Sequence, residues 1–248
     1  MNQVLLITGG SRGIGAATAR LAARRGWAVA VNYASQAAAA DEVVRAITAE
    51  GGRAIAVQGD VGDEAQVLAM FAQVDAELGP LTGLVNNAGV VDMQVRVDEI
   101  TVPRLERMLR INVIGSFLCA REAVRRMSTK HGGAGGVIVN LSSAAAKLGS
   151  PGQYVDYAAS KGAIESFTVG LAKEVADEGI RVNAVRPGLI DTEIHASGGL
   201  PDRATQLAPT VPMKRTGSAA EVANAIVWLL SDEASYATAA FIDVTGGR

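Results

Sequence analysis

Tyr157 and Lys161 lie four residues apart in the run Tyr154-Val-Asp-Tyr-Ala-Ala-Ser-Lys161. This spacing places a phenol and an ammonium on one face of a helix, where they could transfer a proton. At about 4 Å and an effective dielectric constant near 20, the positive charge favours the phenolate by roughly 4 kcal/mol, or about three pKa units. The pair therefore predicts acid/base chemistry. The alternative is a tyrosine at the edge of the core beside a lysine that reaches solvent.

The helix that carries this pair belongs to a regular alternation of short β-rich runs and helical segments. The predicted strands are 4–8, 28–32, 54–58, 81–86, 136–141, 181–185 and 241–244, and the predicted helices are 13–25, 36–50, 63–78, 102–128, 153–178 and 218–231. This alternation is typical of parallel sheets. We therefore expect one α/β domain over residues 1–248, a doubly wound seven-stranded parallel sheet with helices on both faces. Ligands bind such sheets beyond the carboxyl ends of the strands.

Residues 189–217 interrupt the alternation. The segment is rich in glycine, proline and polar residues, and it is long for a connection in this fold. We predict that it forms a substrate lid, and an irregular surface crossover is the alternative. With residues 90–98 and 144–153 it would enclose the substrate pocket, where Lys147 and His195 either contact substrate or are solvated loop residues.

The composition restricts the class of function. The 248 residues, 49% of them hydrophobic, are enough for one large core. The 23 basic and 25 acidic residues are mixed along the chain, which argues against nucleic-acid or anionic-membrane partners. No apolar stretch approaches 18 residues and no signal segment precedes the first strand, so we expect a soluble, cytoplasmic protein that acts on a small molecule. A single cysteine, Cys119, and two separated histidines predict no disulfide and no metal site.

Three predicted strands end in residues that suit nucleotide chemistry. The first runs through Thr8-Gly9-Gly10-Ser11-Arg12-Gly13-Ile14-Gly15 into a helix. Glycines there permit a tight turn and close approach to a pyrophosphate, whose charge is favoured at a helix N-terminus. The fourth strand ends in Asn86-Asn87-Ala88-Gly89 and the fifth in Asn140-Leu-Ser142-Ser143. These ends are expected to meet at one edge of the sheet, beside the helix with the Tyr-Lys pair.

Taken together, the chain resembles the classical short-chain dehydrogenases/reductases. The Thr-Gly-x-x-x-Gly-x-Gly loop, Asn-Asn-Ala-Gly, the strand-end serine and Tyr-x-x-x-Lys occur in family order, and the likeness covers essentially the whole chain. It is most similar to bacterial enzymes called 3-oxoacyl-carrier-protein reductases or glucose dehydrogenases. The resemblance implies a Rossmann fold and an oxidoreductase that transfers a hydride between NAD(P)(H) and a carbonyl or secondary alcohol. A nucleotide-binding regulator or scaffold without turnover is the alternative.

The resemblance also implies roles for four residues. Tyr157 would be the general acid in reduction and the base in oxidation. Lys161 would lower the tyrosine pKa and bind the nicotinamide ribose, and Asn112 would help to hold a proton-relay water. Asparagine is unfavourable inside a helix, so a purely structural role for Asn112 is the alternative. A serine would stabilise charge on the carbonyl oxygen, and the Asn-Leu-Ser-Ser run favours Ser143 over its neighbour Ser142.

Two features near this serine differ from the simplest expectation. Ser143 precedes Tyr157 by 14 residues, whereas the family spacing is 13, so the loop between them is expected to be one residue longer. Tyr154 is a rival phenol, but the residue four positions later is Ala158 and not lysine. We therefore expect Tyr154 to line the pocket without acting as the acid.

The end of the second strand bears on the choice of cofactor. The run Val31-Asn32-Tyr33-Ala34-Ser35 has no carboxylate that would repel a 2′-phosphate, and Arg12 in the glycine loop could pair with one. These features favour NADP(H) over NAD(H), although Arg12 could be only a solvated charge. By resemblance, Asp60 and Val61 lie near the adenine. The full predicted cofactor set is Gly9, Ser11, Arg12, Gly13, Ile14, Gly15, Asn32, Asp60, Val61, Asn87, Ala88, Gly89, Tyr157, Lys161, Pro187, Gly188, Ile190 and Thr192.

The helix with the reactive pair has a second face of small residues, Ala159, Ala163, Ser166 and Gly170. Glycine is unfavourable in a solvated helix, so another helix is expected to pack closely there, most simply from a second copy. Relatives of this kind are often tetramers, which predicts a homotetramer. The helix propensity of alanine is the alternative explanation of the stripe.

Overall fold

The sheet has seven parallel strands in the order β3-β2-β1-β4-β5-β6-β9. The computed structural model describes residues 3–192, 199 and 203–248. The strands are β1 (Val4–Ile7), β2 (Ala28–Tyr33), β3 (Ala54–Gln58), β4 (Gly83–Asn86), β5 (Gly136–Leu141), β6 (Ile180–Pro187) and β9 (Phe241–Val244). The order reverses beside β1, so the predicted doubly wound parallel sheet is confirmed.

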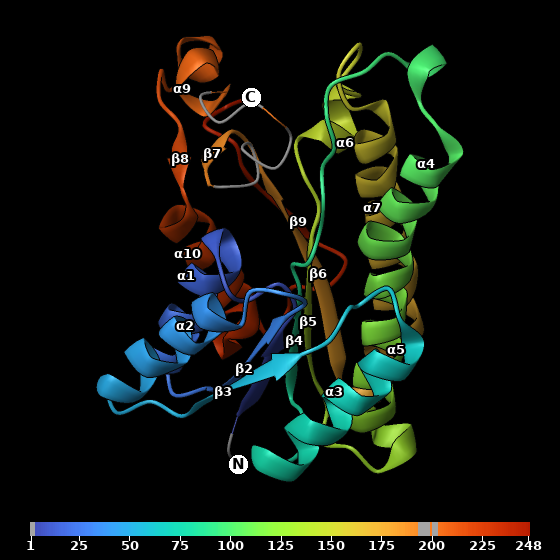
Figure 1. Ribbon diagram of the computed structural model, residues 1–248. Helices are drawn as coiled ribbons and strands as arrows, with labels where there is room; N and C mark the ends of the chain where they lie inside the picture. The colour runs from blue at the N-terminus through green and yellow to red at the C-terminus, as the bar shows by residue number, and fades with distance from the viewer. Residues whose placement is uncertain (1–2, 193–198, 200–202) are drawn as a thin grey trace.

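Helices cover both faces of this sheet (Figure 1). One layer contains α1 (Gly13–Arg24), α2 (Ala37–Ala49) and α10 (Ala219–Leu230), and the other contains α3 (Glu64–Glu77), α4 (Val102–Leu109), α5 (Gly115–Met127) and α7 (Val155–Val175). Successive side chains of β1 are buried in two different hydrophobic cores, one on each face of the sheet. Leu5 packs with α1, α2 and α10, whereas Leu6 packs with α3, α5 and α7, and both are fully buried. A strand buried on both faces explains the continuous apolar run in the sequence.

Two helices begin where their sequences predict. Ser218 accepts a hydrogen bond from Glu221 N at 3.2 Å, and the Glu221 carboxylate accepts one from Ser218 N at 2.8 Å, which is a complete capping box for α10. Asp63 accepts from Gln66 N at 3.1 Å at the start of α3. These caps fix two helices that follow strand ends.

The helix expected over residues 102–128 is not continuous. One π-helical turn, Arg110–Ile114, separates α4 from α5. Asn112 lies in this turn, is 1% exposed, and its main-chain oxygen accepts a hydrogen bond from Ser116 Oγ at 3.2 Å. The wider turn carries a buried polar side chain toward the strand ends, which a regular 3.6-residue repeat does not predict.

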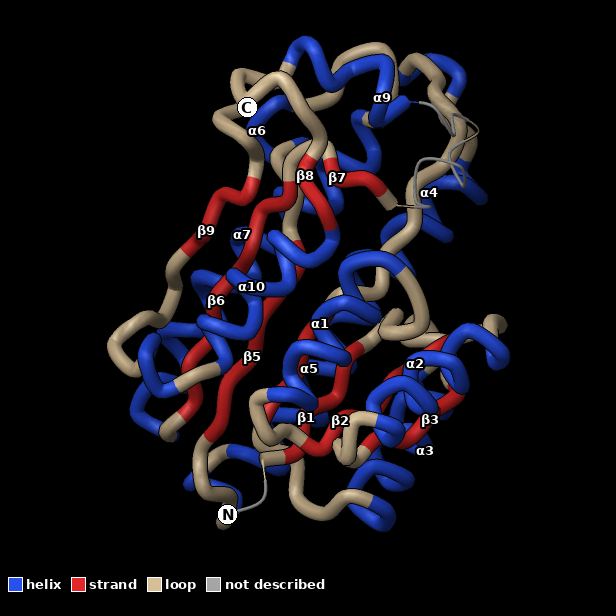
Figure 2. The backbone as a smooth tube through the Cα atoms, turned by 90° about the vertical axis from the view of Figure 1, so that its left-hand side faces the viewer, coloured by secondary structure: helices blue, strands red, loops and turns tan. Residues whose placement is uncertain are grey.

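The crossover after β6 lies beyond the carboxyl ends of β6 and β9 (Figure 2). Here β7 (Ile190–Asp191) pairs in parallel with β8 (Gly217–Ser218), and α9 (Arg203–Leu207) lies between them in the chain. The short α6 (Ala145–Leu148) is at the same end. The predicted lid, 189–217, includes residues 193–198 and 200–202, which lie outside the described residues, so it stays a prediction. No helix in the described part of the chain is long and apolar enough to cross a membrane.

Candidate active site

A cavity of about 180 Å³ lies at the carboxyl ends of β4, β5 and β6, and it brings Ser143, Tyr157 and Lys161 together. These residues come from the end of β5 and from the first two turns of α7. The sequence separates them by up to 18 positions, and the sheet edge gathers them as expected. The other residues that line the cavity are Ile14, Asn87, Gly89, Val91, Leu141, Ser142, Ala144, Ala145, Leu148, Ser150, Tyr154, Pro187, Gly188, Leu189, Ile190, Thr192 and Arg248.

Tyr157 is partly exposed and has Ser143 as its hydrogen-bond neighbour. Burial raises the pKa of the phenol, and the hydrogen bond with Ser143 lowers it by less. This net direction is opposite to the one expected from the Tyr-Lys spacing, because desolvation of the phenolate outweighs the favourable interactions. A phenol with a raised pKa keeps its proton at neutral pH, which suits a group that donates a proton to a carbonyl oxygen.

Lys161 is 5% exposed, and its Nζ donates a hydrogen bond to the main-chain oxygen of Leu141 at 2.7 Å. Its Nζ lies 5.7 Å from the centre of the Tyr157 ring. Burial lowers the pKa of the lysine from 10.5 to about 8. The burial that the spacing argument omitted thus acts on both members of the pair.

The two adjacent serines have different partners. Ser142 is 3% exposed, and its hydroxyl donates to Glu165 Oε1 at 2.8 Å. Glu165 is in turn bound by Arg186, with Nη2 to Oε2 at 2.9 Å. Ser143 is partly exposed and is the serine that bonds to Tyr157, while its Oγ also accepts from Ala145 N at 3.1 Å. The geometry therefore supports the prediction of Ser143 over Ser142.

Asn112 has a structural use for its side chain. Its Oδ1 accepts from Val90 N at 2.8 Å, and its Nδ2 donates to Val90 O at 3.0 Å and to Ser160 Oγ at 3.1 Å. The amide thus clamps the segment after β4 to the helix that holds Tyr157. The role of Asn112 in holding a proton-relay water stays a prediction.

A buried ion pair fixes the start of α7, the helix that carries Tyr157 and Lys161. Asp156, next to Tyr157, accepts two hydrogen bonds from Arg104 of α4, at 2.7 and 3.1 Å, and the side chains of Arg104 and Asp156 are 10% and 1% exposed. Arg104 Nη1 also donates to Met93 O at 2.6 Å. The pair lowers the pKa of Asp156 against the opposing effect of burial. It joins α4, α7 and the segment 90–98 at the edge of the cavity.

Three positions of the glycine loop, 9, 13 and 15, require glycine. Gly9 and Gly13 have φ angles of 60° and 51°, in the left-handed region. A Cβ on Gly15 would collide with Gly9 O and would lie 2.7 Å from Asn87 Nδ2. Asn87 Nδ2 donates to the main-chain oxygens of Thr8 and Gly9, both at 2.9 Å. The loop therefore packs tightly against the N-terminus of α1 and leaves backbone available to a pyrophosphate.

A second cavity of about 540 Å³ follows this loop. It shares Ile14, Asn87, Gly89, Val91 and Thr192 with the first cavity, so the two adjoin. Of the predicted cofactor residues, those that line it are Gly9, Ser11, Arg12, Gly13, Ile14, Asn32, Asp60, Val61, Asn87, Ala88, Gly89 and Thr192. Tyr157, Lys161, Pro187, Gly188 and Ile190 line the first cavity, and Gly15 packs beneath the loop.

Asn32, which was predicted to bind the cofactor, uses its side-chain amide for hydrogen bonds within the protein. It is 2% exposed, its Oδ1 accepts from Gly9 N at 3.1 Å, and its Nδ2 donates to Val57 O and Gly59 O at 3.3 and 3.0 Å. Its amide is therefore engaged with main-chain groups of β3 and of two loops. It shapes the cavity at the end of β2, where the described lining has no carboxylate on residues 32–36.

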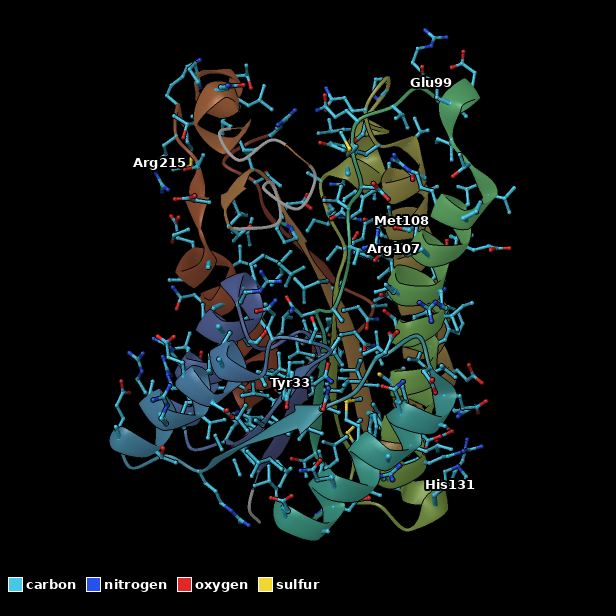
Figure 3. The ribbon with its side chains drawn as sticks, viewed as in Figure 1. Tyr33, Glu99, Arg107, Met108, His131 and Arg215 are labelled. Atoms are coloured by element: carbon cyan, nitrogen blue, oxygen red, sulfur yellow. The ribbon has the colours of Figure 1, made fainter. Side chains whose placement is uncertain are left out.

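Asp92 and Arg107 line the second cavity but were not in the predicted cofactor set, and Asp92 lies in the segment 90–98 that was predicted to enclose the substrate pocket. Arg107 Nη1 lies 3.3 Å from Asp92 Oδ2. Figure 3 labels Arg107 on α4 and Tyr33 at the end of β2, which line this cavity from different elements. Helical periodicity marks Arg107 only as a polar residue, because the distance between α4 and β2 is set by tertiary packing.

The remaining residues singled out from the sequence differ in where they lie. Tyr154 lines the first cavity, as its missing lysine partner led us to expect. Lys147 is exposed and its Nζ binds Asp243 Oδ2 at 2.6 Å, outside the cavity lining. His195 lies outside the described residues. Arg248 lines the first cavity and was missed, although it follows the carboxyl end of β9, where ligands bind in this type of sheet. Over the described residues there is no cluster of metal-binding side chains.

Comparisons with known proteins agree with this geometry. A family model described as enoyl-(acyl carrier protein) reductase matches residues 9–248. The uncharacterized oxidoreductase YgfF of Escherichia coli K12 is 58% identical over 245 residues, which are 99% of each chain. A mutant of a Serratia marcescens short-chain dehydrogenase/reductase superposes with a TM-score of 0.90 at 36% identity, covering 99% of this chain and 97% of that one. The chain belongs to the short-chain dehydrogenase/reductase family.

Other short-chain dehydrogenases/reductases show the range of relatives. Cis-4-hydroxycyclohexanecarboxylate dehydrogenase of Sinomonas cyclohexanicum is 41% identical over 248 residues, 99% of this chain and 96% of the relative. The 3-oxoacyl-[acyl-carrier-protein] reductase FabG of Staphylococcus aureus is 37% identical over 250 residues, 100% of this chain and 98% of the relative. The predicted resemblance is therefore confirmed at the level of the family.

Two related crystal structures contain nicotinamide cofactors. A blue fluorescent protein from a metagenomic library was solved with NADPH (TM-score 0.90, 35% identity, covering 99% and 97% of the chains). A 3-ketoacyl-(acyl-carrier-protein) reductase from Brucella melitensis was solved with NADH (TM-score 0.91, 30% identity, 99% and 98%). The short-chain dehydrogenase/reductase family binds NAD(P)H. The glycine-only cradle and the adjoining cavity of the present chain fit such a dinucleotide.

Proposed function

We propose that this short-chain dehydrogenase/reductase transfers a hydride between NADP(H) and a carbonyl or secondary alcohol, with Tyr157 as general acid and base. The observation that carries the proposal is the junction of the two cavities. Ser143, Tyr157 and Lys161 line the first, the glycine loop lines the second, and Thr192 and Gly89 belong to both. A dinucleotide on the glycine loop would end beside the phenol.

In carbonyl reduction Tyr157, Ser143 and Lys161 have different roles. When bound, a reduced nicotinamide supplies the hydride. Tyr157 donates its proton to the carbonyl oxygen, and its raised pKa keeps that proton in place at neutral pH. Ser143 is placed to donate a hydrogen bond to the same oxygen. Lys161, anchored on Leu141 O, is placed to bind the ribose and to supply positive charge beside the phenolate that forms.

The names of relatives support this reaction class. One is a dehydrogenase of a hydroxycyclohexanecarboxylate and another is a 3-oxoacyl reductase, so both act at a hydroxyl-bearing or oxo carbon. Action on a small molecule, without nucleic-acid or membrane partners, and a cytoplasmic location stay predictions from composition.

The preference for NADP(H) rests on the second cavity. Arg12, Ser35 and Gln36 line it near the end of β2, with no carboxylate among residues 32–36 to oppose a 2′-phosphate. We expect NADPH to bind at least about tenfold more tightly than NADH in a fluorescence titration. Arg12→Gln should weaken NADPH binding about tenfold and leave NADH unchanged. Equal dissociation constants for the two cofactors would remove the preference.

The outer face of α7 supports a homo-oligomer. Ala159, Ser166 and Gly170 are exposed in the single chain, and a Cβ on Gly170 meets nothing within 4 Å. The adjoining helices α4 and α5, with the turn between them, expose further large apolar side chains, namely Val102, Leu105, Leu109, Ile114 and Phe117. Such a face is expected to be covered by a second copy, and a tetramer is our proposal.

The decisive experiment compares two tyrosines of one cavity in a panel of ketones, sugars and acyl thioesters. Tyr157→Phe should lower kcat by about 10³-fold or more while the cofactor dissociation constant stays within about twofold. Tyr154→Phe should retain kcat within about tenfold, and Tyr236→Phe, at a fully exposed site, should match the wild type. A fully active Tyr157→Phe enzyme would refute the mechanism. Cofactor binding without turnover on any substrate would favour the regulator or scaffold.

A further inference from the structure

The cavity that holds Tyr157 has a second cation in its wall besides Lys161. Arg248 lines it, and the described lining contains no aspartate or glutamate. Lys161 is buried and bound to Leu141 O, at the reacting end. Arg248 is exposed and comes from the segment after β9. The two cations therefore line the same cavity from different elements. Lys161 is assigned above to the cofactor ribose and the phenolate, which leaves Arg248 for the substrate.

The path of residues 244–247 fixes where Arg248 lies. Val244 O accepts from Gly188 N at 2.9 Å, and Gly246 O accepts from Met213 N at 3.1 Å. Gly246 and Gly247 have φ angles of 67° and 91°, which a residue with a side chain rarely adopts. A Cβ on Gly246 would also lie 2.8 Å from Val211 Cγ1. Both views place the C-terminal end of the described chain at the end of the sheet where α6, β7 and α9 lie (Figures 1 and 2).

The guanidinium of Arg248 has no hydrogen-bond or ion-pair partner among the residues that the structure describes. The nearby basic residues are already paired. Lys147 Nζ lies 2.6 Å from Asp243 Oδ2, and Arg186 Nη1 lies 3.2 Å from Asp243 Oδ1. An exposed guanidinium without a partner among the described residues, on a residue that lines a cavity together with Leu148 and Leu189, favours an anion as its ligand.

The shape of the donor and the character of the walls select the anion. A guanidinium presents two parallel N–H groups that match the two oxygens of a carboxylate. A phosphate dianion would call for further donors, whereas Lys161 and Arg248 are the only cations in the described lining, which also includes Leu148 and Leu189. A monoanion on an otherwise apolar body fits this cavity best.

We propose that Arg248 binds a carboxylate of the substrate, so that the substrate is an oxo acid whose reacting carbonyl is separate from its carboxylate, or the corresponding hydroxy acid. Arg248 is a specificity residue, since the proton moves at Tyr157 and the hydride at the nicotinamide. The inference rests on the proposed function, because it names the substrate class of the same site.

The test uses matched substrates that differ only in charge. The acids are 4-oxopentanoate and 4-oxocyclohexanecarboxylate, and the neutral partners are their carboxamides. Wild-type enzyme should have a kcat/KM at least about tenfold higher for each acid. Arg248→Gln should lower kcat/KM for the acids at least about tenfold, mainly through KM, and change the carboxamides less than about twofold. Arg248→Lys should fall between, and Arg45→Gln, an exposed arginine on α2, should behave as wild type.

Binding of an unreactive acid separates the two proposals. Cyclohexanecarboxylate should bind wild-type protein, measured by ligand-observed NMR, at least about tenfold more tightly than Arg248→Gln, whereas cyclohexanecarboxamide should not distinguish them. If no substrate turns over but this difference is found, the proposed function fails and the carboxylate site stands. If ketones turn over but acids and carboxamides react alike, or if Arg248→Gln weakens both equally, the carboxylate site is refuted.

Discussion

Lys161 Nζ lies 2.7 Å from the main-chain oxygen of Leu141, the last residue of β5. This hydrogen bond joins α7 to the strand that continues into Ser143. The ammonium and the serine are thereby held on one frame beside Tyr157. The same burial that makes the contact lowers the pKa of the lysine to about 8.

Lys161→Met should change how stability depends on pH. Below a pH of about 8 the lysine is protonated in both states, and above 10.5 it is neutral in both. Between these values only the unfolded chain holds the proton, so the free energy of unfolding of the wild type rises with pH. Relative to Lys161→Met, the wild type should gain roughly 3 kcal/mol between pH 8 and 10.5. Urea unfolding at several pH values measures this difference.

Lys173→Met is the control, because Lys173 is an exposed lysine on the same helix. Its unfolding free energy should follow that of the wild type at every pH. If the difference in unfolding free energy between the wild type and Lys161→Met does not change between pH 8 and 10.5, the lysine is not desolvated in the folded protein.

Ser143→Ala should mainly lower turnover, whereas Ser142→Ala should mainly lower stability. Ser143→Ala should lower kcat about 10²- to 10³-fold with little loss of stability, because it removes the proposed donor to the carbonyl oxygen. Ser142→Ala should keep kcat within about tenfold and lose about 1 to 2 kcal/mol of stability, because it removes a buried hydrogen bond to Glu165. Steady-state kinetics and urea unfolding distinguish them. The reverse pattern would assign catalysis to Ser142.

Gly15→Ala should abolish cofactor binding or folding of the loop, since its Cβ would collide with Gly9 O. Gly162→Ala is the matched control, because a Cβ there meets nothing within 4 Å and the site is helical. It should raise stability by about 1 kcal/mol. Cofactor titration and thermal unfolding measure both. Normal NADPH binding by Gly15→Ala would contradict the tight contact of loop and helix.

Arg104→Met should cost about 3 to 5 kcal/mol of stability, because it leaves the Asp156 carboxylate buried without its partner. The comparison is Arg96→Met, which removes a pair with Asp98 that is exposed on both sides and contributes at most about 1 kcal/mol. Urea unfolding at neutral pH gives both values. Equal losses of unfolding free energy in Arg104→Met and Arg96→Met would show that the ion pair of Arg104 with Asp156 is solvated in the protein.

Gly170→Arg should dissociate the proposed oligomer, because a long charged side chain would enter a helix contact built from small residues. Ala49→Arg, on an exposed position of α2, should leave the mass unchanged. Multi-angle light scattering of the three proteins is the measurement. A wild-type protein with monomeric mass would remove the oligomer proposal altogether.

Local signals in the sequence predicted most of the fold and brought Tyr157 and Lys161 forward as the candidate reacting pair. Alternating strands and helices produced the sheet, the Ser218 capping box began α10, and the spacing of Tyr157 and Lys161 placed both in one cavity. These features depend on helical repeat, strand burial and turn chemistry, which act over a few residues.

Tertiary structure alone decided the rest. Ser142 and Ser143 are neighbours in sequence, but one hydroxyl meets Glu165 and the other meets Tyr157. The π-helical turn at Asn112, the raised pKa of Tyr157 and the position of Arg248 also depend on groups that are distant along the chain. Desolvation and long-range contacts follow from how the elements pack, so no local pattern of residues specifies them.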